Sequence, residues 1–104
     1  MLDTLETSPV RSAFCDDDDF LELIEMFVDG IEEKKQILSQ EVNPEHLDQI
    51  KTLAHQLKGA GAGYGFDELS QLAAKLEEAC KSQDRIEIAQ QKELLLHHLN
   101  RIVV

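Results

Sequence analysis

The sequence predicts an all-α fold, an antiparallel up-and-down four-helix bundle preceded by a short N-terminal arm or helix. In four long segments the apolar residues recur every three to four positions, which is the period of an amphipathic helix. No segment alternates apolar and polar residues as a half-buried strand does, and the segments are joined by short loops, which favour antiparallel neighbours. We therefore expect residues 1–15 to form the arm or short helix, with Leu2, Leu5 and Val10 as its apolar residues, and residues 16–104 to form the bundle.

The first helical segment, at about residues 16–40, begins with four consecutive aspartates from Asp16 to Asp19. An aspartate accepts hydrogen bonds from the free amides at a helix start, and its negative charge suits the positive end of the helix dipole. A calcium loop would need interleaved ligands and a later glutamate, so we interpret the run as helix capping. Gly30 interrupts this helix only mildly. Its apolar stripe contains Phe20, Leu21, Ile24, Phe27, Val28, Ile31 and Leu38.

The second helix starts with a clear capping signal. Asn43 is a good N-cap, and Pro44 at the first helical position loses no hydrogen bond. We expect this helix to extend to about Tyr64 and to end at Gly65, which can adopt the left-handed conformation.

Two further helices follow. Asp67 can cap a helix over residues 68–81, and Asp84, with Glu87 three residues later, can cap a last helix over residues 85–102. Apolar residues at helical spacing mark the buried side of both segments.

Composition narrows the class of protein. A chain of 104 residues, 42% of them hydrophobic and none of them tryptophan, suits one domain with an aliphatic core. The net charge of −11 argues against a nucleic-acid-binding surface and disfavours anionic membranes. The sequence contains neither a signal peptide nor an apolar run long enough to span a membrane, so we expect a cytoplasmic protein. Cys15 and Cys80 lie in no C-x-x-C pattern and are expected to be free thiols.

The second helix carries a candidate reactive histidine, His55. Lys51 and Lys58 lie one turn before and after it, and all three point away from the apolar stripe of the helix. A neutral imidazole facing water is a nucleophile, and the two lysines can favour a phosphoryl group once it arrives. The small residues from Gly59 to Ala62 cost helix stability and can leave room for another molecule. An ordinary surface histidine is the alternative interpretation.

Ala54 to Gly59 reads Ala-His-Gln-Leu-Lys-Gly, and Gly65 follows ten positions after the histidine. This pattern resembles the His-x-x-Lys-Gly signature of histidine-containing phosphotransfer (HPt) domains, and the similarity extends over residues 16–104. The resemblance implies an up-and-down four-helix bundle. It also implies that His55 accepts a phosphoryl group from the aspartyl phosphate of a receiver domain and passes it to another receiver. Lys58 would offset the phosphate charge, and Gly59 would let the receiver approach.

The resemblance further implies that the protein needs no cofactor of its own, since the magnesium ion lies in the receiver. The expected partners are response-regulator receiver domains and a hybrid histidine kinase, bound by a monomer. Lys51 and Ala62 are expected on the docking face, together with exposed apolar side chains of the first helix. In some members a polar side chain of the following helix orients the histidine ring. Glu77 or Lys81 lies in that stretch, although several relatives carry glutamine at the Glu77 position and a solvated helix face is the alternative for Glu77.

Three other functions are compatible with parts of the pattern. The chain could be the phosphoacceptor module of a chemotaxis-type histidine kinase, charged by an ATP-binding domain elsewhere, since it has no phosphate-binding loop itself. A metal-binding bundle would need inward Glu-x-x-His pairs, but His46, His97 and His98 are predicted to lie off the apolar stripes. A structural adaptor would not need an intact His55 and Lys58. Met1 and the compact ending at Val104 favour a free-standing protein.

Overall fold

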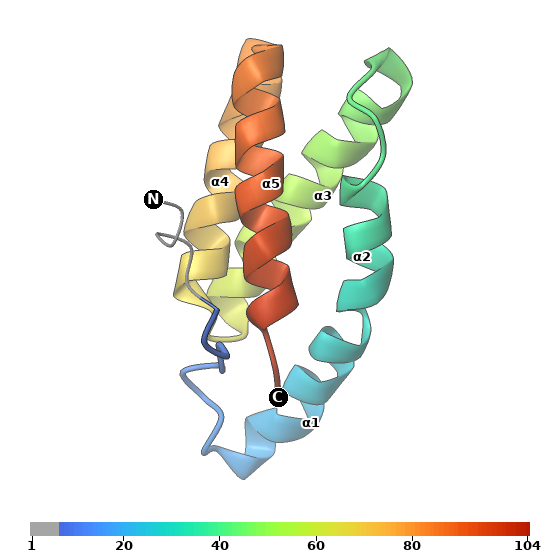
Figure 1. Ribbon diagram of the computed structural model, residues 1–104. Coiled ribbons are helices and arrows are strands. Elements are labelled where there is room, and N and C mark those ends of the chain that lie inside the picture. Colours follow the sequence, from blue (N-terminus) through green and yellow to red (C-terminus); the bar gives the residue numbers. More distant parts are fainter. Residues whose placement is uncertain (1–6) are drawn as a thin grey trace.

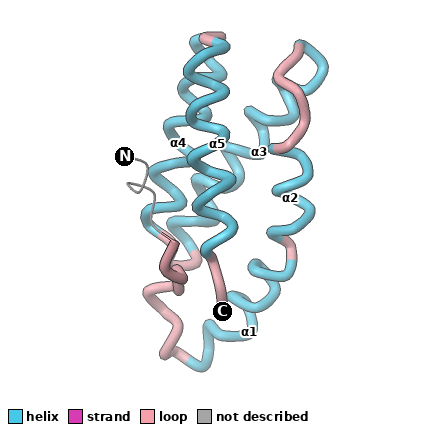
Figure 2. The backbone as a smooth tube through the Cα atoms, in the orientation of Figure 1, coloured by secondary structure: helices cyan, strands magenta, loops and turns pink. Residues whose placement is uncertain are grey.

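The computed structural model describes residues 7–104, which form five helices (Figure 1). Their bounds are α1 Asp18–Asp29, α2 Ile31–Leu38, α3 Pro44–Gly63, α4 Asp67–Ser82 and α5 Arg85–Arg101. Because α1 and α2 follow each other along one side of the molecule, the architecture is the predicted four-helix bundle (Figures 1 and 2). Residues 7–104 contain no β-strand, only an isolated bridge between Val10 and Ile102.

The first helical segment is broken at Gly30, where we had predicted one helix over residues 16–40. The Gly30 amide donates to the carbonyl oxygens of Met26 and Phe27, at 3.3 and 3.1 Å, so α1 ends there and α2 starts at the next residue. The capping interpretation is confirmed at the other end of α1. The Asp17 carboxylate accepts a 3.0 Å hydrogen bond from the amide of Asp19.

The boundaries of α3 agree with the prediction. The side chain of Asn43 accepts a 2.9 Å hydrogen bond from the amide of His46, and Pro44 is the first helical residue. The helix ends at Gly63, and Gly65 has a φ of +84°, in the left-handed region that favours glycine. This conformation turns the chain sharply, so that α4 packs back against α3.

The start of α4 differs from the prediction that Asp67 caps it. Phe66 occupies the cap position without a side-chain hydrogen bond, and Asp67 is the first residue of the helix. Phe66 is only 2% exposed and stacks on Phe27 with ring centroids 5.6 Å apart. The burial of Phe66, and not a polar capping side chain, therefore fixes the start of α4. At α5 the cap is as predicted, because the Asp84 carboxylate accepts a 3.1 Å hydrogen bond from the amide of Glu87.

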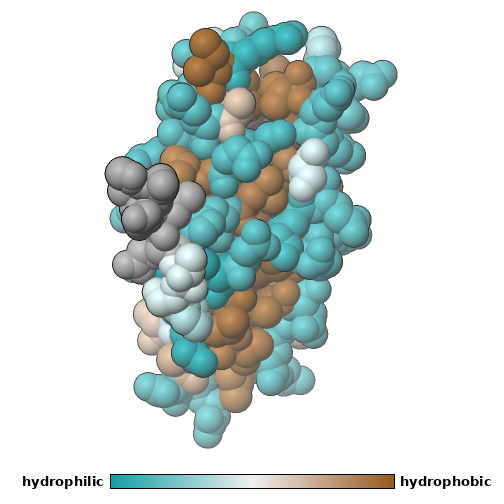
Figure 3. All heavy atoms as spheres, viewed as in Figure 1, coloured by the Kyte–Doolittle hydropathy of each residue, from teal (hydrophilic) through white to brown (hydrophobic). Residues whose placement is uncertain are grey.

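The core is aliphatic and lies between all the helices. Most of its side chains come from the predicted stripes, as the largest fully buried apolar ones illustrate: Ile24, Leu38, Ile50, Leu57, Leu69, Leu76, Ile88, Leu95 and Leu99. Hydrophobic side chains also reach the surface along the middle of the face shown in Figure 3. A groove of about 1160 Å³ lies on the side of the bundle formed by α2 and α5, with Lys35, Gln36, Leu94 and Leu96 among its lining residues.

Helices α3 and α4 approach very closely at Gly61. A Cβ atom at this position would lie 2.8 Å from the backbone nitrogen of Ser70 and 3.0 Å from the carbonyl oxygen of Phe66. The Ser70 hydroxyl also donates a 2.7 Å hydrogen bond to the carbonyl oxygen of Lys58. The side chains of α4 are therefore held close against the part of α3 that carries His55.

The N-terminal arm forms hydrogen bonds with two distant segments. The Val10 amide donates to the carbonyl oxygen of Arg101, and the Val10 carbonyl oxygen accepts from the amide of Val103. The Ala13 amide donates to the carbonyl oxygen of Gly65 at 2.8 Å. The described part of the arm, residues 7–15, contains no helix, and Leu2 and Leu5 of the predicted arm lie outside the described residues.

Candidate phosphoryl-acceptor site

His55 lies on the outer face of α3, as predicted. Its side chain is 68% exposed, whereas Ile50, Leu53, Ala54 and Leu57 of the same helix are buried in the core. The amphipathic pattern of α3 therefore fixes the ring at the surface, where a molecule in solution can reach it.

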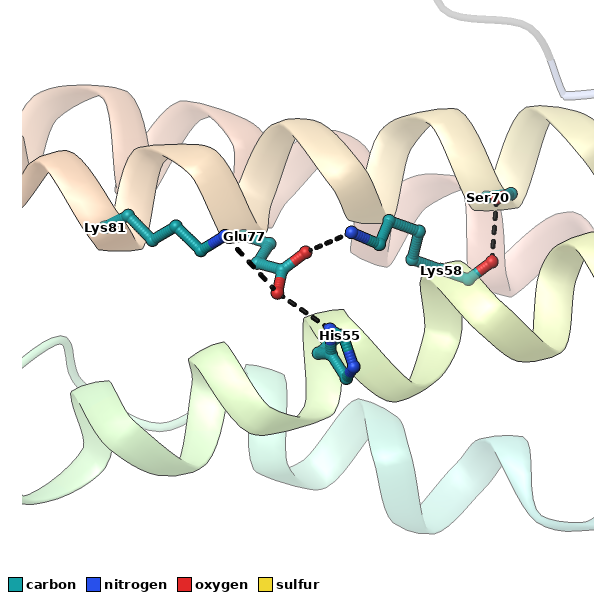
Figure 4. Close-up of polar contacts among 5 residues, drawn as sticks. All are labelled: His55, Lys58, Ser70, Glu77 and Lys81. Carbon is teal, nitrogen blue, oxygen red and sulfur yellow. Dashed lines mark hydrogen bonds and ion pairs between the residues drawn. The ribbon is translucent and has the colours of Figure 1, made fainter.

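Glu77 of α4 contacts both His55 and Lys58 (Figure 4). Its Oε2 atom lies 2.9 Å from Nδ1 of His55, and its Oε1 atom lies 2.7 Å from Nζ of Lys58. The Glu77 side chain is only 8% exposed, so its interpretation as part of a solvated helix face is wrong. Glu77 lies at the edge of the buried face of α4, and the close packing at Gly61 brings that edge onto α3.

The Glu77 carboxylate is ionised at neutral pH. The hydrogen bond from Lys58 lowers the pKa of Glu77 most strongly, burial opposes this by raising the pKa, and the hydrogen bond with His55 lowers it further. An ionised carboxylate only accepts hydrogen bonds, so the neutral His55 ring must carry its proton on Nδ1 to contact it. The lone pair is then on Nε2, the ring nitrogen that points away from Glu77 in Figure 4.

Two other lysines lie near the site, Lys81 beside the Glu77 carboxylate and Lys51 one turn before His55. Nζ of Lys81, on α4, is 4.0 Å from Oε2 of Glu77, and the Lys81 side chain is 55% exposed. Lys51 is half-buried one turn before His55. Its positive charge also acts on Cys80 of α4, whose pKa is raised mainly by burial and lowered in part by Lys51. The site thus combines one buried negative charge with several positive ones.

The surface beside His55 is open, but only some of the small residues contribute to it. Gly59 and Ala62 are exposed, and a Cβ atom at Gly59 would meet nothing within 4 Å. Gly61, which we had expected to provide room for a partner, is buried against α4 instead. Ala60 is partly buried against the core. The spacing could not distinguish these roles, because a small residue suits both a partner and a closely packed helix.

Helix α1 packs near the end of α3 and exposes apolar side chains. The rings of Phe27 and Tyr64 lie 5.2 Å apart, which joins the two helices. Leu23 and Met26 of α1 are 44% and 66% exposed. The helix that begins at the aspartate run therefore offers apolar surface, as predicted.

The other histidines do not form a comparable site. His98 is only 2% exposed, so its predicted position off the apolar stripe is wrong. Its ring nitrogens have no hydrogen-bond partner among residues 7–104, and burial lowers its pKa. Nδ1 of half-buried His46 lies 2.9 Å from the carbonyl oxygen of Glu41. Within the same residues no group of three or more His, Cys, Asp or Glu side chains could hold a metal ion. Cys15 and Cys80 are free thiols.

Comparison with known protein families gives a match over most of the chain. The model of a family described as the Hpt domain matches residues 22–103, which include α2 to α5 and His55, Lys58 and Glu77. No significant match to a curated protein or to a solved structure was found. No helix in the described part of the chain is both long enough and apolar enough to cross a membrane.

Proposed function

The chain belongs to the Hpt domain family, and on that basis we propose that it is a phosphoryl carrier of a two-component phosphorelay. In this proposal His55 accepts a phosphoryl group from the aspartyl phosphate of one receiver domain and passes it to a second receiver. The observation that carries the proposal is the contact between Nδ1 of His55 and Oε2 of Glu77 at 2.9 Å, which leaves the exposed Nε2 as the nucleophile.

The transfer step is balanced without a proton donor. The Nε2 lone pair attacks phosphorus while the bond between phosphorus and the aspartyl oxygen breaks, and the aspartate leaves as a carboxylate. The phosphorylated ring keeps its proton on Nδ1 and becomes cationic. Because Glu77 is negatively charged and in contact with this nitrogen, it stabilises the cation that forms. The reverse step returns the neutral ring with the same proton in place.

Lys58 is the residue that we propose to offset the charge of the transferred group. Phosphoryl transfer relies mainly on positioning and on charge stabilisation, and Lys58 lies one turn from His55 with 41% of its side chain exposed. Any magnesium ion would be held by the receiver, so this chain would need no cofactor of its own.

The proposed docking face combines positive charge with apolar surface. Lys51 and Lys58 are basic residues on a chain with a net charge of −11, and the phosphorylation pocket of a receiver is acidic. Charge complementarity of this kind favours encounter and orients the partner. Gly59 and Ala62 leave space beside the ring, and the exposed side chains of Leu23 and Met26 on α1 would extend the contact.

The experiment that tests this function is incubation of the full chain with a phosphorylated receiver. The chain should gain a base-stable, acid-labile label, and His55→Gln should abolish the label. His46→Gln is the matched control, since this half-buried histidine lies outside the site and its substitution should leave the label unchanged. Labelling of the His55→Gln variant would show that another residue is the acceptor. If no receiver of the source organism labels the chain but an ATP-bound kinase domain does, the chain is a phosphoacceptor module of a kinase instead.

A second experiment tests the docking face. Gly59→Leu should weaken binding of the receiver in a titration while leaving the fold intact, because the side chain would project into open space. Gly59→Ala adds only one methyl group and serves as the control for the change in backbone. Equal affinity of the two variants would place the receiver elsewhere on the surface.

A further inference from the structure

We propose that Lys81 is a positioning residue that frees Lys58 for the incoming phosphoryl group by replacing it as the counter-ion of Glu77. The inference rests on the proposed function of His55 as the phosphoryl acceptor. It assigns to Lys81 a role through Glu77 and not a direct contact with the phosphoryl group.

Lys58 already forms an ion pair with Glu77. Its Nζ atom lies 2.7 Å from Oε1 of Glu77, a carboxylate whose side chain is 8% exposed. A cation that leaves a buried carboxylate without replacement leaves an uncompensated charge, which is strongly unfavourable. Until the ring itself becomes cationic, Lys58 can therefore turn to an incoming phosphoryl group only if another positive charge reaches Glu77.

Lys81 is close enough to supply that charge. Its Nζ atom lies 4.0 Å from Oε2 of Glu77, at the outer limit of an ion pair, and it comes from the same helix one turn later (Figure 4). The Lys81 side chain is 55% exposed, so it can change rotamer without disturbing the core. A shift of about one ångström would bring it to the usual distance of a charge-assisted hydrogen bond, about 2.7–2.9 Å.

The charges favour the exchange while the phosphoryl group arrives, before the ring has gained its positive charge. A phosphoryl group brings about −1.5 to −2 charges at neutral pH and three acceptor oxygens, which attract Lys58. As Lys58 moves, Lys81 moves onto Glu77, and Glu77 keeps its contact with the proton on Nδ1 of His55. The carboxylate thus remains compensated throughout the transfer.

The test uses potassium phosphoramidate, a small phosphodonor, so that no receiver is needed. Nε2 of His55 attacks its phosphorus, the bond between phosphorus and the amide nitrogen breaks, and ammonia leaves with a proton from water. Loading of the full chain is followed by phosphorus NMR, with His55→Gln as the blank. Lys81→Gln should load about two- to fivefold more slowly, since exposed ion pairs contribute modestly. Lys81→Arg should restore the rate, because it keeps the charge.

The control variant is Lys75→Gln, which removes the same charge from an exposed position of the same helix. It should load at the wild-type rate, and circular dichroism should show that all of these variants keep the helical fold. If Lys75→Gln slows loading as much as Lys81→Gln, the effect is only that of net charge and the proposal is wrong.

Double variants separate action through Glu77 from direct action on the phosphodonor. In a Glu77→Gln background, Lys58 needs no release, so adding Lys81→Gln should not change the rate further. The same holds in a Lys58→Gln background, where there is no lysine to release. A full effect of Lys81→Gln in either background would show that Lys81 acts directly on the donor and would overturn the proposal.

The two proposals can fail separately. If the wild-type chain loads from phosphoramidate at His55 with the predicted Lys81 dependence but exchanges phosphoryl groups with no receiver, the counter-ion exchange is supported and the proposed function fails. If receivers label His55 while Lys81→Gln loads from phosphoramidate like wild type, the function is supported and the role of Lys81 is wrong.

Discussion

Replacement of Gly61 by alanine should destabilise the bundle, whereas the same replacement at Gly59 should stabilise it. Both glycines lie within α3, two positions apart, so both variants gain the helix propensity of alanine, about 1 kcal/mol each. They differ in what the new methyl group meets. At Gly59 it meets nothing within 4 Å, and at Gly61 it would lie 2.8 Å from the Ser70 backbone nitrogen.

The difference between the two variants isolates the cost of the close helix contact. The propensity gain is common to both and cancels, and overpacking a closely packed interior costs about 1–3 kcal/mol. We therefore expect the free energy of unfolding of Gly61→Ala to be lower than that of Gly59→Ala by about 1–3 kcal/mol. Because the obstructing atoms belong to the backbone of Phe66 and Ser70, the clash cannot be relieved by a change of rotamer.

Urea unfolding followed by circular dichroism measures this difference directly. Thermal unfolding gives a second readout, since 1 kcal/mol shifts the melting temperature of a domain of this size by about 4–8 °C. If Gly61→Ala is as stable as Gly59→Ala, α3 and α4 are not held at the distance described here, and the positioning of Glu77 against His55 loses its explanation.

Three further predictions concern pH and capping. The pKa of Glu77 is lowered from its ordinary value of 4.5, so its ion pairs stabilise the fold above pH 4.5. This stabilisation is lost as the pH falls through the pKa of Glu77 in the folded state. Glu77→Gln should therefore reduce the pH dependence of urea unfolding in that acid range. His98 is buried and its pKa is lowered from 6.5, so as the pH falls the unfolded chain takes up a proton before the folded chain does. The free energy of unfolding should therefore fall as the pH drops below 6.5. His98→Gln should remove this pH dependence, whereas His46→Gln should keep it. Asp84→Ala should cost about 1 kcal/mol in urea unfolding, because its carboxylate caps α5, and Asp67→Ala should cost clearly less, because Asp67 makes no cap hydrogen bond.

The sequence alone predicted the bundle and most helix boundaries, because these depend on local signals. The stripe of α3, the cap at Asn43 and the turn at Gly65 each have one simple physical cause, and each lies where we expected it. Two boundaries differ from the prediction. Phe66 occupies the cap position of α4 because its ring is buried against Phe27. A periodic pattern cannot show that the helix breaks at Gly30.

The candidate site was predicted only as far as a single helix determines it. The exposure of His55 follows from the period of α3, but the contact with Glu77 depends on how closely α4 approaches. Gly61 allows α3 and α4 to approach this closely. In the sequence alone, a glycine at this position is equally compatible with the approach of an external partner. The burial of His98 was not predicted, because the buried face of α5 is wider than the apolar stripe in the sequence. Position 98 lies between the buried positions 95 and 99.

The ring contact between Phe27 and Tyr64 gives the protein an intrinsic optical probe. The chain contains one tyrosine and no tryptophan, so Tyr64 dominates its ultraviolet emission over the weakly emitting phenylalanines. The Tyr64 ring lies 5.2 Å from the ring of Phe27 in α1, and the carbonyl oxygen of Tyr64 accepts a hydrogen bond from the hydroxyl of Ser12 in the arm. Emission of the unlabelled protein therefore reports on the junction of α1, α3 and the arm, and a receiver that lacks tryptophan and tyrosine could be titrated against it without any added dye.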